Sequence, residues 1–238
     1  MKLERAATVD AWAELVTRLL VERLQRTPTL RLCLPTGLTP VPIFDRLAAA
    51  IARRDVSLAR ATIFLLDEFG GVAPNDPGRC DSMLRRGLLD RVDLPPAQFH
   101  GFDLTGDVER ECASFEAAVG DGCDISLLGI GSNGHIGMNE PGSPPDSVTR
   151  RVTLAADTVT ASARYFNRQH DLPTWGVTMG VGTILRSREI WVLATGAGKA
   201  AIVSRTLRGP VTDAIPASLL RTHANTLLFA DEDAAAMS

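Results

Sequence analysis

The feature that most constrains the fold is an alternation of short, continuously apolar runs with longer segments of helical periodicity. The runs read TLRLCL, ATIFLL, ISLLGI, EIWVLAT and NTLLFA, at residues 29–34, 61–66, 125–130, 189–195 and 225–230. A continuous rather than alternating apolar run is typical of a strand buried on both faces of a parallel sheet. The alternation with helices predicts an open, mostly parallel, doubly wound α/β sheet (Rossmann-like), with helices on both faces.

The segments between these runs carry the helical pattern. Apolar side chains recur at helical spacing in DAWAELVTRLLVERLQ, and Asp10 is the expected N-cap. Residues 143–173 have no strong pattern and are rich in Pro, Ser and Thr, so we expect them to cover the core as a lid. The whole chain, 1–238, is expected to be one domain. Further helices are expected at residues 41–53, 82–91, 107–119, 174–187 and 198–209.

Composition narrows the class of partner. The net charge is −3 without a clustered basic excess, which argues against nucleic acid, although a small anionic ligand remains compatible. No run of eighteen apolar residues is present, so we expect no membrane span. The four cysteines are scattered, without a CxxC pair, which argues against zinc and favours a reducing, cytoplasmic location.

Four glycine-rich or acidic loops follow four of the predicted strands. Ligands of open parallel sheets bind outside the carboxyl ends of the strands. Any one such loop is typical of an ordinary turn, but four at one edge predict a shared site. The loops are PTGLTP (35–40), DEFGG (67–71), GIGSNGHIGMNEPG (129–142) and TGAGK (195–199).

Two of these loops have the character of an anion site. In PTGLTP, Gly37 lets the backbone approach an anion at a helix N-terminus, and Thr36 and Thr39 add hydroxyl donors. The Gly-Lys-Ser/Thr ending of a P-loop is absent. Lys199 lies at the start of a helix, where the dipole disfavours a cation. An anionic ligand would offset that cost.

The other two loops offer acid–base chemistry. A carboxylate buried at a strand end has a raised pKa, which would suit Asp67 to the work of a general base. For Glu68 we favour a structural interpretation, in which it hydrogen-bonds the following turn. His135 can exchange a proton near neutral pH, and Glu140 could fix its tautomer. A lone loop histidine is more often structural than one paired with a carboxylate.

These motifs together resemble one known family. LPTGLTP, LLDEFGG, GIGSNGHIGMNEPGS, SARYF, TMGVGTIL and the GxxK of residues 196–199 occur in the order and spacing of the glucosamine-6-phosphate deaminases, also called isomerases. The resemblance extends from about residue 10 to 232, and NGHIGMNEPG is its most specific element. It implies conversion of glucosamine 6-phosphate and water to fructose 6-phosphate and ammonia, without a metal or organic cofactor.

The resemblance also implies residue roles. His135 would open the sugar ring, assisted by Glu140 and Asn133. Asp67 would move a proton between C2 and C1 through an enediol-type intermediate. The lid would exclude water when its arginine meets the phosphate. The phosphate-binding set implied by the family is Gly37, Leu38, Thr39, Arg164 and Lys199, with Thr36 added from the turn chemistry above.

The chain departs from the family pattern at two places. Where the family reads HPESY, this chain has Asp76-Pro77-Gly78-Arg79-Cys80, which places an arginine and a cysteine close to the expected pocket and leaves the exact amino sugar phosphate open. Where the family reads DSRTR, Arg150 is kept, but Val152 stands where a lysine is expected. This second departure predicts that allosteric activation by N-acetylglucosamine 6-phosphate is lost.

Two alternatives remain open. A 6-phosphogluconolactonase shares the fold and a related loop, but the glutamate of NEP, Glu140, belongs to the deaminase pattern. A non-catalytic sugar-phosphate sensor would need a DNA-binding part, and the sugar-phosphate domain accounts for the whole of this sequence. The oligomeric state is left open.

Overall fold

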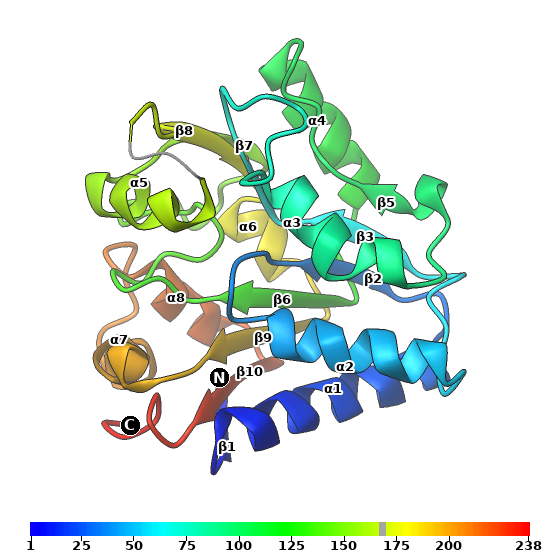
Figure 1. Cartoon of the computed structure of the whole chain (residues 1–238). Helices are drawn as coiled ribbons and strands as arrows, with labels where there is room; N and C mark the ends of the chain where they lie inside the picture. The colour runs from blue at the N-terminus through cyan, green and yellow to red at the C-terminus, as the bar shows by residue number, and fades with distance from the viewer. Residues whose placement is uncertain (167–169) are drawn as a thin grey trace.

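The structure of the protein is a computed structural model that describes residues 1–166 and 170–238. Within these residues, seven strands form one parallel sheet in the order β1-β10-β9-β6-β2-β3-β5 (Figure 1). Its strands are β1 (Lys2–Ala6), β2 (Arg31–Leu34), β3 (Thr62–Leu65), β5 (Phe99–His100), β6 (Ile125–Gly129), β9 (Glu189–Ala194) and β10 (Thr226–Asp231).

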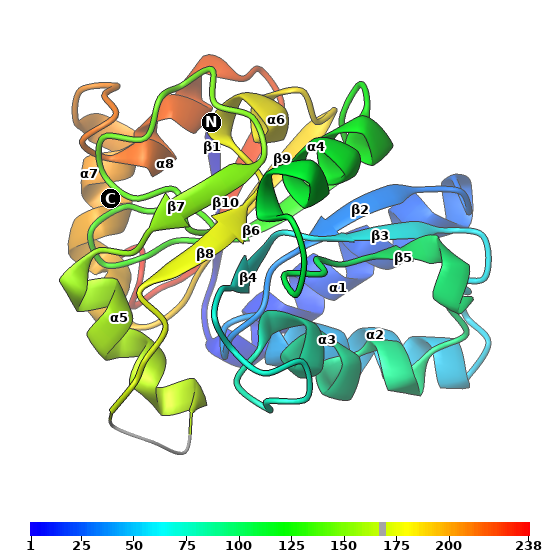
Figure 2. The same ribbon diagram turned by 90° about the horizontal axis from the view of Figure 1, so that it is seen from above.

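Helices cover both faces of this sheet, which confirms the predicted fold class. Helices α1, α2 and α3 lie on one face, and α4, α6 and α8 lie on the other (Figures 1 and 2). The indole of Trp12 in α1 is fully buried and donates to the carbonyl of Phe229 in β10 at 3.1 Å. The helices are α1 (Val9–Arg26), α2 (Val41–Ala52), α3 (Cys80–Gly87), α4 (Val108–Val119), α5 (Ala156–Ser162), α6 (Val181–Leu185), α7 (Ala200–Arg208) and α8 (Pro216–Leu219).

The direction of winding changes between β2 and β6. The chain passes from β2 through α2 to β3 on one side, and from β6 to β9 and β10 on the other. The two strands pair directly, with Leu32 opposite Ile125, so the loops at their carboxyl ends diverge. Such a switch point is where open α/β sheets bind ligands. The topology therefore brings the PTGLTP and GIGSNGHIGMNEPG loops to one crevice.

A second, antiparallel sheet stands beside the first and was not predicted. It has the order β4-β8-β7, from Asp67–Phe69, Trp175–Thr178 and Arg150–Thr153. The prediction of one helix over 174–187 is wrong at its start, because Trp175–Thr178 pairs with strands on both sides. The chain leaves the large sheet at Leu66, so Asp67 begins β4 instead of ending β3.

The expected lid is partly regular structure. It contains β7, α5 and the short 3₁₀ turn Ala163–Tyr165, while its residues 167–169 lie outside the described residues. The N-cap of α1 is Thr8 rather than Asp10, since the Thr8 hydroxyl accepts from the Ala11 N–H at 3.1 Å. Asp10 instead forms an ion pair with Arg46. No helix in the described part of the chain is both long and apolar enough to span a membrane.

Candidate active site

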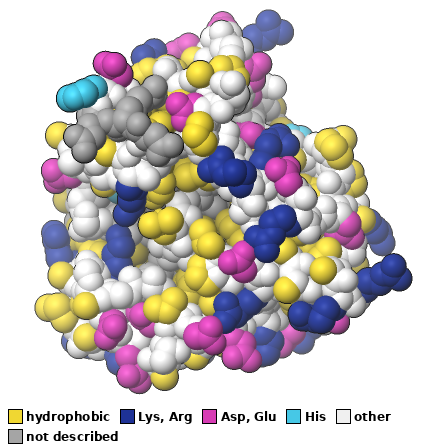
Figure 3. All heavy atoms as spheres, in the orientation of Figure 1, with side chains coloured by type: hydrophobic (Ala, Val, Ile, Leu, Met, Phe, Trp, Pro, Cys, Tyr) yellow, Lys and Arg dark blue, Asp and Glu magenta, His cyan; other side chains and the backbone are white. Residues whose placement is uncertain are grey.

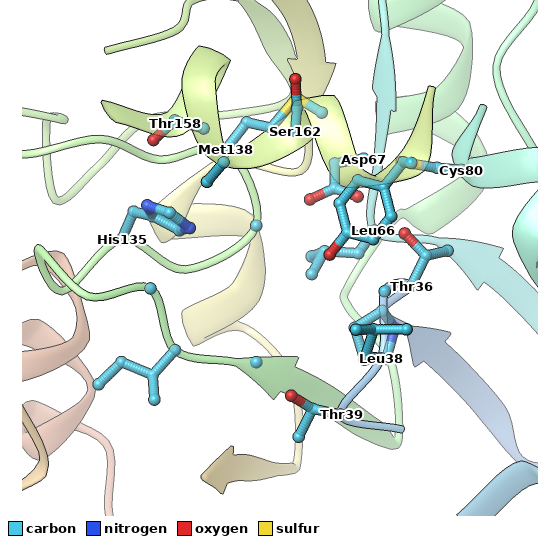
Figure 4. Close-up of a pocket in the computed structure, with 18 of the residues that line it drawn as sticks. Thr36, Leu38, Thr39, Leu66, Asp67, Cys80, His135, Met138, Thr158 and Ser162 are labelled. Carbon is cyan, nitrogen blue, oxygen red and sulfur yellow. The ribbon is translucent and has the colours of Figure 1, made fainter. Parts of the chain in front are cut away.

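A cavity of about 380 Å³ opens at the carboxyl edge of the large sheet. The face seen in Figure 1 is hollowed between α5 and α2 (Figure 3), and Figure 4 shows the side chains inside. All four loops that were predicted to share a site contribute residues to its lining. The predicted residues that line it are Thr36, Gly37, Leu38, Thr39, Asp67, His135, Arg164 and Lys199.

Asp67 is the carboxylate that faces this cavity. Its side chain is almost withdrawn from solvent, with 8% of the residue exposed. Burial raises the pKa of Asp67 to about 7; the charge of Glu68 adds to the rise, while Cys80 and His135 oppose it. The pairing of Asp67 with Thr178 in β8 fixes its backbone. A rigid carboxyl group that titrates near neutral pH can both take up and release a proton.

Glu68, the next residue, is turned away from the cavity. It is fully buried, and its carboxylate accepts from the N–H groups of Phe69, Cys80 and Asp81 at 2.8, 2.9 and 3.0 Å. The last two donors are the first residues of α3. The structural interpretation of Glu68 is confirmed, because it binds the helix N-terminus whose N–H groups would otherwise lack acceptors.

Arg79 is not a cavity residue, contrary to expectation. Its guanidinium pairs with Glu68 at 3.2 Å and donates to the carbonyls of Pro74 and Phe102 at 3.0 and 3.1 Å. Buried charge needs such partners, and Glu68 supplies the opposite charge. Of the two unusual residues, only Cys80 reaches the cavity wall.

His135 is held from behind by Glu140 and Asn133. The amide of Asn133 donates to the Glu140 carboxylate at 2.9 Å, and its carbonyl oxygen accepts from the His135 backbone at 3.1 Å. Nδ1 of His135 lies 3.6 Å from Glu140 Oε2 and makes no hydrogen bond to any described residue. Glu140 and Asn133 therefore orient His135 without lining the cavity themselves.

The pKa of Glu140 falls to about 2. Burial acts in the opposite direction, but it is outweighed by interactions with His135, Thr158 and Asn133. The N–H of Ala155, just before α5, also approaches Glu140 at 3.3 Å. Glu140 is thus a permanent negative charge beside the imidazole at any working pH.

The glycines of this loop allow two close approaches. A Cβ at Gly131 would lie 2.2 Å from the His135 ring, so only glycine lets the ring fold over the backbone there. Gly137 has a φ of +58° and a Cβ there would lie 2.7 Å from the Thr178 hydroxyl and 3.4 Å from the Asp67 carboxylate. Glycine tolerates both conditions because it has no Cβ. The loop can therefore bring His135 and Asp67 to the same cavity.

The cationic side of the cavity is built by Lys199 and Arg164. Nζ of Lys199 donates to the Ile130 carbonyl at 2.7 Å. Burial lowers the pKa of Lys199, and the positive charge of Arg164 lowers it further. Helix α2 begins at Val41 directly after the PTGLTP turn, and no side chain caps it. Two neighbouring cations and an uncapped helix N-terminus together favour an anion.

Part of the lid forms one wall. Thr158 and Ser162 of α5 and Tyr165 line the cavity, and a Cβ at Gly37 would lie 2.7 Å from the Tyr165 hydroxyl. None of these three residues was predicted from the sequence as a site residue. Tyr165 lies beside Arg164 in the SARYF motif, which was an available signal. Ser162 is the first residue of the same motif, whereas Thr158 lies outside it, in a weakly patterned segment without a distinctive signal.

Arg150 supports the same loop from outside the cavity. Its guanidinium donates to the Asn139 side chain at 2.9 Å, and Asn139 donates to the Ile136 and Met179 carbonyls, both at 2.9 Å. In the described residues, no group of three or more His, Cys, Asp or Glu side chains is close enough to hold a metal ion.

Comparison with known proteins gives a consistent result. A family model described as glucosamine-6-phosphate isomerases/6-phosphogluconolactonase matches residues 3–229. The glucosamine-6-phosphate deaminase of Shouchella clausii is 37% identical over 240 residues, covering 100% of this chain and 97% of its own. That of Rhodopirellula baltica is 39% identical over 225 residues, covering 93% and 90%.

Solved structures agree. A monomeric glucosamine-6-phosphate deaminase matches over 100% of both chains, with a TM-score of 0.96 and 33% identity. A 6-phosphogluconolactonase from Trypanosoma brucei has a TM-score of 0.78 and 23% identity, covering 99% of this chain and 97% of its own, which shows a shared fold. The chain belongs to the glucosamine-6-phosphate isomerase/6-phosphogluconolactonase family.

Proposed function

We propose that this protein is a glucosamine-6-phosphate deaminase, which converts glucosamine 6-phosphate and water to fructose 6-phosphate and ammonia. One observation carries the proposal: a near-neutral carboxyl group, Asp67, and a carboxylate-backed histidine, His135, share one cavity with the cations Lys199 and Arg164. The names of the relatives support the same reaction. A cavity of about 380 Å³ is suitable for one hexose phosphate.

The phosphate is the anchor of the substrate. Lys199 and Arg164 supply positive charge, and the turn before α2 supplies N–H groups from Gly37, Leu38 and Thr39, with the Thr36 hydroxyl beside them. A fixed phosphate places the reactive carbons at a constant distance from the acid–base groups. Such positioning accounts for a large share of enzymatic rate acceleration.

Ring opening is the first chemical step. The imidazole of His135 takes the proton of the C1 hydroxyl and gives a proton to the ring oxygen, which leaves an open-chain aldehyde. The Glu140 carboxylate, 3.6 Å from Nδ1 of His135, favours a proton on that nitrogen by its charge, so the other ring nitrogen exchanges the proton with the sugar. Asn133 holds both residues in register, as its two hydrogen bonds support.

Proton transfer between two carbons follows. Asp67 removes the proton from C2, next to the C1 aldehyde, and the electron pair moves toward the C1 oxygen. That oxygen takes a proton from the ammonium group of the substrate, so an enol that carries the amine forms. The same carboxyl group returns a proton to C1, which leaves an imine at C2. Water adds to this imine and ammonia departs, giving fructose 6-phosphate. A base with a pKa near 7 is suited to both directions of this transfer.

A lactonase is the second candidate, and Glu140 argues against it. Lactone hydrolysis requires an activated water but no proton transfer between carbons, so it gives no role to a second acid–base group, Asp67, in the same cavity as His135. Ammonia release and 6-phosphogluconolactone hydrolysis should be compared on one preparation. Release of ammonia without lactone hydrolysis supports the deaminase, and the reverse result would replace it with the lactonase.

The proposal also covers the lid, allosteric regulation and the location of the protein. The lid, residues 143–173, closes over the substrate through Arg164. The engagement of Arg150 with Asn139 and the presence of Val152 support a loss of allosteric activation. All four cysteines are free thiols, which supports a cytoplasmic location.

The deciding experiment is a panel of hexosamine 6-phosphates with ammonia detection. We expect glucosamine 6-phosphate to be turned over best. If another hexosamine phosphate is turned over instead, the reaction stands and the substrate is corrected. If glucosamine 6-phosphate binds without release of ammonia from any member of the panel, the protein is a sensor.

A further inference from the structure

Cys80 is the one unusual residue that reaches the cavity wall, and it lies beside the proposed base. It is the first residue of α3, with 2% of its surface exposed, and it lines the cavity together with Asp67 and Thr36. Figure 4 shows the three residues on the same side of the cavity. They come from three separate segments, so their approach is a product of the fold and not of sequence proximity.

The position of Cys80 is fixed through its backbone. Its N–H donates to Glu68 at 2.9 Å, and Arg79 pairs with the other oxygen of the same carboxylate at 3.2 Å. Asp67 and Glu68 therefore lie near different parts of Cys80, its side chain and its backbone. Glu68 holds the backbone, and Asp67 lines the cavity together with the Cys80 side chain.

We propose that Cys80 is a positioning residue for Asp67: its S–H donates a hydrogen bond to the Asp67 carboxylate, and the Thr36 hydroxyl donates in turn to the sulfur. This proposal rests on the proposed function, in which Asp67 is the base. In this proposal, Cys80 orients the Asp67 carboxylate toward the substrate carbons.

The thiol suits this task because it stays neutral. Burial raises the pKa of Cys80 well above its ordinary value, and the charges of Asp67 and Glu68 raise it further. A buried neutral thiol is inert as a nucleophile but keeps its proton as a donor. Because S–H is a weak donor, it orients the carboxylate without making it a much weaker base. The contact with Cys80 lowers the pKa of Asp67, but burial raises this pKa by more.

The test is the titration of the Asp67 carboxyl carbon, followed by NMR in ¹³C-labelled protein without substrate. Asp67→Asn assigns the signal. We expect Cys80→Ala to raise the Asp67 pKa by roughly half to one unit, as loss of a weak donor to a charged group implies. Cys80→Ser keeps a donor and should titrate at or below the wild-type value. Cys123→Ala, another buried cysteine that does not line the cavity, is the matched control and should leave the titration unchanged.

Two results would overturn the proposal. One is a Cys80→Ala protein in which Asp67 titrates as in the wild type or at lower pH. The other is an equal upward shift in the Ala and Ser variants, which would mean that packing and not the donor matters. Because this titration needs no turnover, its failure is distinct from a failure of the proposed function. Where the enzyme is active, the acid limb of kcat/KM should move in parallel with the NMR value.

Discussion

Asp67 and Glu140 are both largely withdrawn from water near one cavity, yet their pKa values move in opposite directions. The pKa of Asp67 rises to about 7, and that of Glu140 falls to about 2. Glu140 is surrounded by donors from Asn133, His135 and Thr158, which replace the lost water. Asp67 lies next to the charge of Glu68, and the interactions with Cys80 and His135 offset burial only weakly. Asp67 is the more deeply buried of the two and has fewer donors around it, and both differences separate a group suited to proton transfer from one suited to electrostatic support.

The largest effect is expected from removing the carboxylate that titrates. Asp67→Asn keeps the shape but cannot accept a proton, so kcat for ammonia release should fall by roughly a thousandfold or more. Substrate binding, measured by calorimetry, should survive. Asp121→Asn changes an exposed aspartate and is the control. Near-normal turnover in Asp67→Asn would remove Asp67 from the mechanism.

Neutralising the other carboxylate should cost less. Glu140→Gln retains hydrogen bonds to its neighbours but loses the charge beside His135, and we expect kcat to fall by roughly ten- to a hundredfold. Steady-state kinetics measure the change, with the exposed Glu14→Gln as control. If Glu140→Gln lost as much activity as Asp67→Asn, the division of roles between the two carboxylates would be wrong.

Outside the acid–base pair, Lys199 should affect binding more than chemistry. Lys199→Met removes one of two cations, and KM should rise by roughly tenfold or more, as expected for a lost charge-assisted hydrogen bond. Lys2→Met, on the exposed edge strand, provides the matched control. A change in kcat alone, with KM constant, would argue that the phosphate lies elsewhere.

The pH dependence should report Asp67 and not Glu140. A base must be deprotonated to act, so kcat/KM should fall about tenfold for each pH unit below a pKa of about 7. Glu140, with a pKa of about 2, stays ionised throughout this range. An acid limb that persists with the same pKa in the residual activity of Asp67→Asn would assign the limb to another group.

The free energy of unfolding should also depend on the ionisation of Asp67, with a smaller effect than the one on activity. The folded pKa of Asp67 is raised from an unfolded value of 3.8 to about 7, so its contribution is present at low pH and is lost as pH rises through 7. Asp67→Asn removes the cost of burying a charged carboxylate above pH 7. Its free energy of unfolding in urea should exceed that of the wild type at pH 8 by up to about 4 kcal/mol, and by less at pH 5. A gain independent of pH would show that Asp67 is not buried in its charged form.

The large sheet and the composition of the cavity could be predicted from sequence for a physical reason. Buried parallel strands are continuous apolar runs, and the loops at their carboxyl ends must meet at one edge. Asp67, His135 and Lys199 were therefore predictable as neighbours. The raised pKa of Asp67 also followed from its place at the end of an apolar run.

Other features depend on contacts that no local pattern encodes. The small sheet pairs Asp67 with Thr178, over a hundred residues away, through strands of three and four residues. Such short strands have too few positions to show a period, so Trp175–Thr178 was predicted as helix. The direction of the Arg79 side chain depends on Glu68 and Phe102, so sequence alone could not show that Arg79, next to Cys80, would not line the cavity.

The most direct test of the account follows the proton itself. Glucosamine 6-phosphate is incubated with the protein in D₂O, and the product is analysed by NMR and mass spectrometry alongside released ammonia. Because the carboxyl proton of Asp67 exchanges with solvent between the two transfers, the account predicts fructose 6-phosphate with deuterium at C1 and equimolar ammonia from the wild type, and roughly a thousandfold slower formation of both from Asp67→Asn. Deuterated product from Asp67→Asn at the wild-type rate, or ammonia released without fructose 6-phosphate, would contradict it.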